Sequence, residues 1–470
     1  MNPRLVALLA ATAAVAGCGG GGRQNTAAPT TKTSATGVPK TIKVPPESPY
    51  YLLLQAQQQP HVDYRKQVGT CRVGAEASCP GARLAGQNLT GAVVPLSNLR
   101  TLDLHGGSLA VSNGSFAQMQ GADLSNVNLI GGSFSFTNLE RANLSGARIT
   151  FAGITGVNLR DARLRATDGY FGAIVGSDMR GADLRGMAFP DSDINGTDLR
   201  GADMRDMNLI NADFTGSRLE GADLRGSHFC NTLMPDGKVM APHKGLCPGQ
   251  IRPGPKGAQP ITVSADSPLF RAIYALQTGT QVQAGTVVRG CKIQAFTKCP
   301  GARVQGENLQ GAFLAYAGLQ RADLRNVNFQ LGSLAYGHAA NARLDGAALG
   351  ATAFADADLT GASLRGTTLA LAVMAGTHLN GADLSQADAR SMVFDGAELR
   401  GAKLMGTSLA GSSLVEADLR GADLEGANLS DALLVGANLS GANRTGATLC
   451  NTIMPDGSVS HPSSSPCPGT

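Results

Sequence analysis

The 470-residue chain has no tryptophan, only 4% aromatic residues and only 16% charged residues. It also lacks the G-x-S-x-G, H-E-x-x-H, P-loop and C-x-x-C motifs of common enzymes. Its seven histidines are scattered along the chain, so we expect no catalytic residue, no cofactor and no metal site. Few aromatics together with 61 glycines are poor material for an ordinary globular core. The composition therefore favours a repetitive architecture.

The N-terminus predicts export. MNPRLVALLAATAAVAGC has a basic start and an apolar stretch from Leu5 to Val15 that is too short to span a membrane. V-A-G-C resembles a bacterial lipobox, in which Cys18 becomes the acylated first residue of the mature chain. We therefore predict a lipoprotein signal peptide over 1–18, a flexible tether over 19–47 and a location on the outer face of the cell membrane. The alternative is an ordinary secretory signal with a chance cysteine.

The other eight cysteines form four local pairs that repeat at an offset of 220 residues. Bridges within each pair are the economical interpretation in an oxidising compartment, although eight cysteines allow many pairings. Clustered cysteines can also bind zinc, but spacings of eight and seventeen without supporting histidines make this unfavourable. The predicted disulfides are Cys71 with Cys79, Cys230 with Cys247, Cys291 with Cys299, and Cys450 with Cys467.

A period of five residues runs through two long segments. Counting by fives from Leu84 to Phe229 gives thirty positions, and only Gly114 and Gly169 among them are not apolar. A second run extends from Val304 to Leu449. This period fits neither a helix nor a flat strand, so the chain must turn regularly, with glycine at many of the corners. GADL and its variants recur at spacings that are multiples of twenty residues, which indicates that four five-residue segments form one coil.

The phrases ADLRG, ANLSG and ADLEG resemble the signature of the pentapeptide-repeat family. This resemblance implies an all-β fold, the right-handed quadrilateral β-helix. We expect two tandem lobes, over 48–250 and 267–470, joined by a linker over 251–266. An open coil needs caps. We expect them in the P-D-G loops after Cys230 and Cys450, and in short helices over 48–60 and 267–279 that pack on the first coils.

The lobes are close to neutral. Residues 71–250 hold 16 basic and 17 acidic residues, and residues 291–470 hold 12 and 15. Some family members mimic DNA, but that role needs a strongly acidic surface, so we expect no nucleic-acid partner. Arginines stack in successive coils beside Asp183, Asp203 and Asp223, which predicts a salt-bridged outer face or, alternatively, a strip that binds anions.

One face of each coil is unusually apolar. Among its 28 outward positions, only Asp193, Asp213 and Asp395 are charged. Such a face usually marks an interface, either between the lobes, with a second copy, or with a partner. The predicted interface residues are Phe313, Val373, Val393, Val415, Leu433 and Val435, flanked by the aromatic pairs Phe116 with Phe136, Phe151 with Phe171, and Tyr316 with Tyr336.

These features predict a membrane-anchored lipoprotein that acts as a rigid binding or scaffold module, with an envelope component, a protein or a second copy as its partner. The alternative is an extracytoplasmic enzyme that acts on cell-wall or capsular polysaccharide, because some parallel β-helices cleave polysaccharides.

Overall fold

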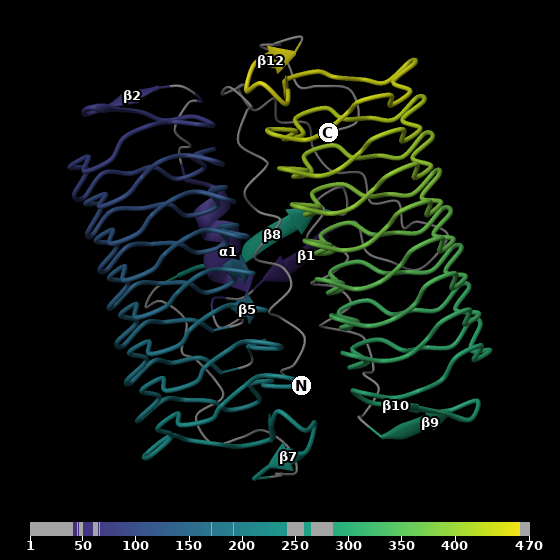
Figure 1. Cartoon of the computed structure of the whole chain (residues 1–470), viewed down its shortest axis with the longest axis horizontal. Coiled ribbons are helices and arrows are strands. Elements are labelled where there is room, and N and C mark those ends of the chain that lie inside the picture. Colours follow the sequence, from purple (N-terminus) through teal and green to yellow (C-terminus); the bar gives the residue numbers. More distant parts are fainter. Residues whose placement is uncertain are drawn as a thin grey trace.

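Two coiled stacks lie side by side in the computed structural model, which describes residues 41–44, 46, 50–59, 64, 66–170, 172–190, 192–241, 258–264 and 285–460 (Figure 1). We call residues 66–241 the first lobe and residues 285–460 the second lobe. The first lobe begins at β2 (Gln67–Val68) and ends at β7 (Val239–Met240). The second lobe begins beside β7 and ends near β2, so the stacks run in opposite directions.

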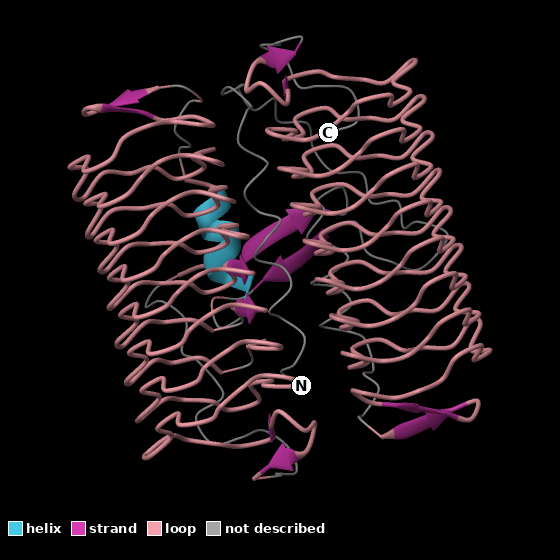
Figure 2. Cartoon of the chain, in the orientation of Figure 1, coloured by secondary structure: helices cyan, strands magenta, loops and turns pink. Residues whose placement is uncertain are grey.

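Each coil takes twenty residues. Parallel bridges join residues twenty apart on adjacent coils, such as Asp103 with Asp123, and four bridging residues fall in each coil. The backbone N–H of Leu84 donates to the carbonyl of Asp103 at 2.6 Å, and the N–H of Asp103 donates to the carbonyl of Ala82 at 2.9 Å. Because each five-residue segment contributes one bridging residue, most of both stacks is drawn as loop in Figure 2. The parallel strands β4 (Gly153–Thr155) and β5 (Ala173–Val175) are a more regular stretch of the same pairing.

A tight corner follows each inward residue. The N–H of Leu102 donates to the carbonyl of Leu99 at 3.1 Å, which closes a turn whose third residue, Thr101, has a φ of 53°. Glycine tolerates this left-handed conformation best, which explains its frequency at the corner position.

Each lobe has one continuous core built from the residues of the five-residue period. The two glycines that interrupt the period in the first lobe are compensated by phenylalanines one coil later. A Cβ at Gly114 would lie 2.8 Å from the ring of Phe134, and a Cβ at Gly169 would lie 2.3 Å from the ring of Phe189. The larger ring therefore fills the space that the glycine leaves.

Short antiparallel hairpins stand at the ends of the lobes. They pair β2 with β3 (Cys71–Arg72), β6 (Thr232–Leu233) with β7, β9 (Thr286–Val288) with β10 (Cys291–Ile293), and β11 (Thr452–Ile453) with β12 (Val459–Ser460). Cys71 and Val73 belong to the buried core of the first lobe, and Cys291 and Ile293 to that of the second. The first coils are therefore covered by hairpins.

Helix α1 (Tyr50–Gln57) exists, but its predicted position on the first coil is wrong. Leu53 and Leu54 instead share a buried cluster with corner residues from the middle of both lobes. These corners offer a wide apolar surface, whereas a hairpin already covers the first coil. The corner residues are Ala110, Val111, Ile130, Phe151, Leu331, Ala351 and Leu371. The second predicted helix, over 267–279, lies outside the described residues.

A two-stranded sheet joins the predicted tether to the predicted linker. β1 (Thr41–Val44) pairs antiparallel with β8 (Ile261–Ser264), and Ile42 and Val263 are buried in the same cluster as α1. The sheet lies between the lobes at mid-height in Figure 1. The tether and the linker are therefore shorter than predicted from sequence, because each contributes a strand to this sheet.

Candidate functional surfaces

The two lobes pack against each other along the apolar faces, and we call this contact the seam. The amide Nδ2 of Asn113 donates to the hydroxyl of Ser413 at 3.0 Å, and the hydroxyl of Ser115 donates to Asp395 at 2.6 Å. All four side chains are buried. The hydroxyl of Tyr64 also donates to the carbonyl of Gly457, at 3.0 Å.

The apolar part of the seam contains most of the residues predicted as an interface. Val373 and Val393 are buried in one cluster with Phe136 of the first lobe. A second cluster joins three second-lobe residues, Val415, Leu433 and Val435, to Val93, Leu96 and Phe116 of the first lobe. Phe313 is buried beside Leu233. Phe151 lies in the cluster around α1, and Phe171 lies outside the described residues.

Aromatic rings at corner positions stack along both sides of the seam. The ring centroids of Phe116 and Phe136 are 4.9 Å apart, and those of Tyr316 and Tyr336 are also 4.9 Å apart. All four residues have φ between 56° and 60°, a conformation that disfavours bulky side chains. Glycines of the opposite lobe face them. A Cβ at Gly216 would lie 2.4 Å from the hydroxyl of Tyr316, so glycine is required for this close approach.

The contacts repeat with a pseudo-twofold symmetry. Thr41 pairs with Ser264 and Val44 pairs with Ile261, so residues related by the offset of 220 exchange places across the sheet. Gly216 faces Tyr316, and their equivalents, Gly436 and Leu96, also face each other. A duplicated chain therefore packs on itself as two subunits of a symmetric dimer would. The offset of 220 was visible in the sequence, but it did not show which elements pair.

The seam also buries carboxyl groups. Burial raises the pKa of Asp395 to about 6, although Ser115, Ser413 and the N–H of Val415 donate to its carboxylate. Burial and the neighbouring Asp213 raise the pKa of Asp193 well above its usual range. Beside Asp193, the side-chain amide of Asn195 is fully buried, and neither its nitrogen nor its oxygen has a hydrogen-bond partner within the described ranges. Burial therefore shifts Asp193 and Asp395 toward the protonated form.

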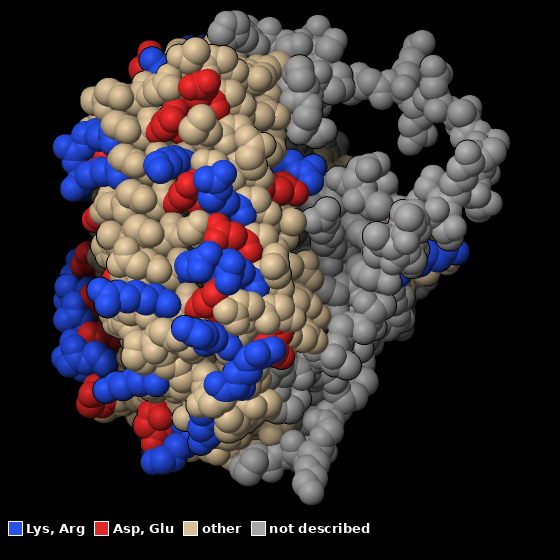
Figure 3. All heavy atoms as spheres, turned by 90° about the vertical axis from the view of Figure 1, so that its right-hand side faces the viewer, with Lys and Arg blue, Asp and Glu red and all other residues tan. Residues whose placement is uncertain are grey.

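The outer faces carry ladders of paired charges. Arg185 Nε lies 2.9 Å from Asp183 Oδ1 in its own coil and 3.4 Å from Asp203 Oδ2 in the next coil. Arg205 makes the same two contacts, with Asp203 at 2.6 Å and Asp223 at 3.5 Å. The hydrogen bond that Arg225 donates to Asp223 lowers the pKa of Asp223 to about 2. Figure 3 shows basic and acidic side chains alternating over the outer side of the second lobe.

Every described cysteine is disulfide-bonded. Cys71 is bonded to Cys79 and Cys291 to Cys299, with Cα distances of 5.3 and 5.8 Å. Cys230 and Cys450 are also disulfide-bonded. Their predicted partners, Cys247 and Cys467, and the predicted lipidation site, Cys18, lie outside the described residues. Over the part of the chain that the structure describes, no helix is both long and apolar enough to cross a membrane, and α1 has only eight residues.

Comparisons with known proteins agree with the repeats. A family profile for pentapeptide repeats matches eight times, over residues 117–150, 133–165, 174–206, 192–231, 339–376, 353–388, 372–411 and 417–454. No curated protein matches the sequence.

Solved pentapeptide-repeat structures resemble the chain at low identity. HetL from the cyanobacterium Nostoc sp. strain PCC 7120 is 18% identical, with 82% of this chain and 90% of HetL covered and a TM-score of 0.16. A protein of the Arabidopsis thaliana thylakoid lumen is 26% identical, with 21% and 65% covered and a TM-score of 0.18. QnrB1, a plasmid-mediated fluoroquinolone resistance protein, is 19% identical, with 36% and 88% covered and a TM-score of 0.24. From the eight profile matches and the twenty-residue coils, we conclude that the chain belongs to the pentapeptide-repeat family.

Proposed function

We propose that the protein is an exported lipoprotein that holds a rigid pentapeptide-repeat scaffold at the outer face of the membrane. The observation that carries this proposal is that the two lobes turn their apolar faces toward each other, with disulfides near the lobe ends. The result is one stiff body. V-A-G-C at Cys18 supplies the anchor, and the residues between Cys18 and β1 supply the tether.

Because the seam uses the apolar faces, partner binding falls to the outer faces. These present ion-paired arginines and aspartates, so a partner would be polar and its binding sensitive to salt. A component of the cell envelope with charged groups fits such a surface.

The enzyme alternative is less well supported. A glycosidase needs a general acid whose pKa is raised. The ladder carboxylates Asp203 and Asp223 have lowered pKa values because arginines donate to them. Asp193 and Asp395, whose pKa values are raised, are buried in the seam, where a polymer would not reach them.

The anchor is tested by changing Cys18→Ser and separating membranes from soluble protein. We expect the parent protein in the membrane fraction, labelled by a fatty-acid analogue, and the variant in the soluble fraction without label. Membrane retention of the variant would contradict the anchor.

The scaffold is tested with the soluble Cys18→Ser protein and isolated cell envelopes. We expect binding that weakens in high salt and when Arg185 and Arg205 are both changed to Glu, with no sugar released. Release of soluble sugar from the envelopes would favour the enzyme, and the absence of any binding would contradict the scaffold.

A further inference from the structure

Among the described coils, six bridges join two acidic residues, and we call each of them an acid rung. Like charges at this spacing repel, so each rung needs a compensating cation or a lost charge. In four rungs an arginine stands two residues after the first acid. The rungs are Asp103–Asp123, Asp178–Asp198, Asp183–Asp203, Asp193–Asp213, Asp203–Asp223 and Glu398–Asp418, and the arginines are Arg180, Arg185, Arg205 and Arg400.

Two rungs lack this arginine. Asp193–Asp213 is buried in the seam, where burial raises the pKa of Asp193 and so favours a neutral carboxyl group. Asp103–Asp123 lies at the surface, and His105 occupies the position of the arginine. An imidazole differs from a guanidinium because it can release its proton near neutral pH and then has a lone pair that can bind a metal ion.

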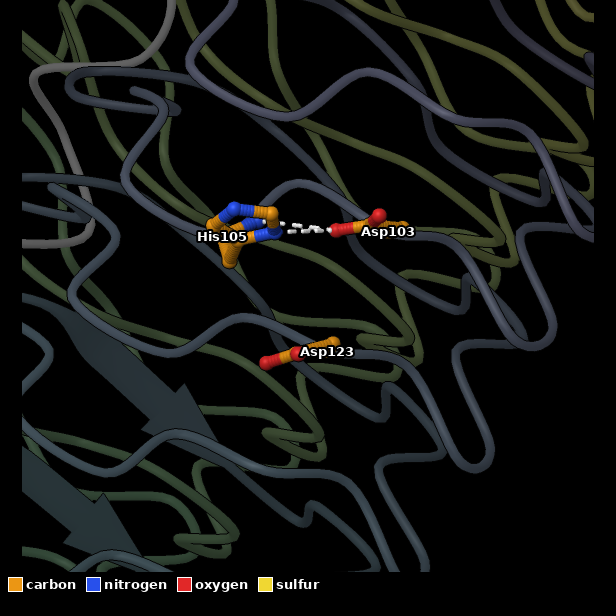
Figure 4. A group of neighbouring side chains, drawn as sticks. All are labelled: Asp103, His105 and Asp123. Atoms are coloured by element: carbon orange, nitrogen blue, oxygen red, sulfur yellow. Dashed lines mark hydrogen bonds and ion pairs between the residues drawn. The ribbon is translucent and has the colours of Figure 1, made fainter.

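The three side chains converge (Figure 4). His105 Nδ1 lies 2.6 Å from Asp103 Oδ1, and the ligand atoms of His105, Asp103 and Asp123 all lie within 4.8 Å of one another. The histidine side chain is 55% exposed, so an ion could reach it from solvent. Asn143 Nδ2 and the N–H of Ser125 donate to Asp123 Oδ1, at 3.2 and 3.0 Å, which orients this carboxylate.

We propose that Asp103, His105 and Asp123 bind a divalent transition-metal ion of the zinc class. One imidazole and two carboxylates suit Zn²⁺, whereas Mg²⁺ and Ca²⁺ prefer oxygen ligands alone. The ion takes the place of the guanidinium that neutralises the other exposed rungs. Three protein ligands leave a position for water, so the site is open on its outer side.

Two neighbouring effects set how strongly the ion binds. Arg83, one coil before Asp103, acts electrostatically on this carboxylate and opposes a second cation. His105 Nδ1 lies within hydrogen-bond distance of Asp103, and a metal ion needs the unprotonated imidazole, so protons compete with the ion and binding is weaker at pH 6 than at pH 8.

The test is calorimetric titration of the full chain with Zn²⁺, without reductant so that the disulfides stay intact. His105→Arg restores the arginine of the other rungs and should fold normally. We expect this variant to bind one Zn²⁺ fewer than the parent protein. Asp123→Asn should weaken that site by roughly tenfold or more, and Arg83→Gln should strengthen it.

His378→Arg is the matched control, because His378 lies 3.4 Å from the carboxylate of Glu398 but belongs to no group of three converging ligand side chains among the described residues. It should leave the parent's affinity at the His105 site unchanged. Equal Zn²⁺ binding by the parent and His105→Arg would overturn the proposal. So would NMR spectra in which the His105 ring titrates with pH but does not respond to Zn²⁺, since the histidine would then only form an ion pair.

Discussion

Asp193 and Asp203 occupy the same position in their repeats, directly before the inward residue, but they lie on opposite sides of the coil. Asp203 is on the outer face, where a hydrogen bond from Arg205 lowers its pKa. Asp193 is in the seam, where burial under the second lobe raises its pKa. The repeat therefore determines the direction of a side chain, and the surface opposite determines its chemistry.

The sharpest way to break this contrast is to place charge in the apolar part of the seam. Val373→Asp with Val393→Asp adds two carboxylates to the buried apolar cluster beside Phe136. We expect a loss of roughly 3 to 5 kcal/mol in the free energy of unfolding, because buried unpaired charges are strongly destabilising. Since neither side chain belongs to the core of its lobe, we expect small-angle scattering to show separated lobes with unchanged circular dichroism.

Met405→Asp is the matched control for that double variant. Met405 is 38% exposed on the outer face, so this change should alter stability by no more than about 0.5 kcal/mol. A compact double variant with the parent's thermal midpoint would show that the seam contributes little to the assembly.

The second prediction uses pH. The pKa of Asp395 rises from 3.8 to about 6 on folding, so its contribution is fully present below pH 4 and is lost as pH rises through 6. A pKa difference of about two corresponds to roughly 3 kcal/mol in the free energy of unfolding. Thermal unfolding of the parent should therefore lose stability relative to Asp395→Asn between pH 4 and pH 8.

The outer ladder should respond in the opposite direction. The lowered pKa of Asp223 means that its contribution is present above pH 4 and is lost as pH falls through about 2. The stability of Asp223→Asn should therefore rise relative to that of the parent only in strong acid. If Asp395→Asn and Asp223→Asn had the same pH profile, the contrast between seam and ladder would be wrong.

The third prediction concerns the aromatic corners. Phe136 has a φ of 57°, and its ring packs on Phe116. Phe136→Gly relieves the backbone, by about 1 kcal/mol, but removes the packing, so we expect a net loss of roughly 1 to 3 kcal/mol in denaturant unfolding.

The exposed Ala166 has a similar φ, of 51°, and lies outside the seam. Ala166→Gly should therefore be neutral or slightly stabilising. A stabilised Phe136→Gly would show that backbone strain outweighs the interlobe contact.

Much of this architecture follows from sequence, because each five-residue segment repeats the same local rule. Even the exceptions obey it, since Phe134 and Phe189 follow Gly114 and Gly169 by one coil. The low charge of one face was also visible, but charge alone could not distinguish packing of the lobes from binding of a second copy.

The position of α1 and the β1–β8 sheet could not be predicted, since both depend on surfaces far away in the chain. Leu53 and Leu54 share one buried cluster with Ile130 of the first lobe and Leu371 of the second, so their position depends on how the lobes pack. β1 and β8 have only four residues each, which is too short for an alternation of polar and apolar residues to predict a strand or its partner. His105 directly follows the inward residue Leu104, but its relation to Asp123, which lies one coil away, appears only in the fold.

The smallest effect is expected on the outer ladder. Arg185→Gln removes the contacts with Asp183 and Asp203 while leaving Arg165 beside Asp183. Exposed ion pairs contribute little and are screened by salt, so the loss should be below about 1 kcal/mol and should disappear in roughly 1 M NaCl. The seam variant Phe136→Gly contains no ion pair and should keep its deficit in the same salt. Denaturant unfolding of both proteins at low and high salt makes this comparison. A salt-independent loss in Arg185→Gln as large as that in Phe136→Gly would mean that the ladders hold the coils together as much as the seam holds the lobes.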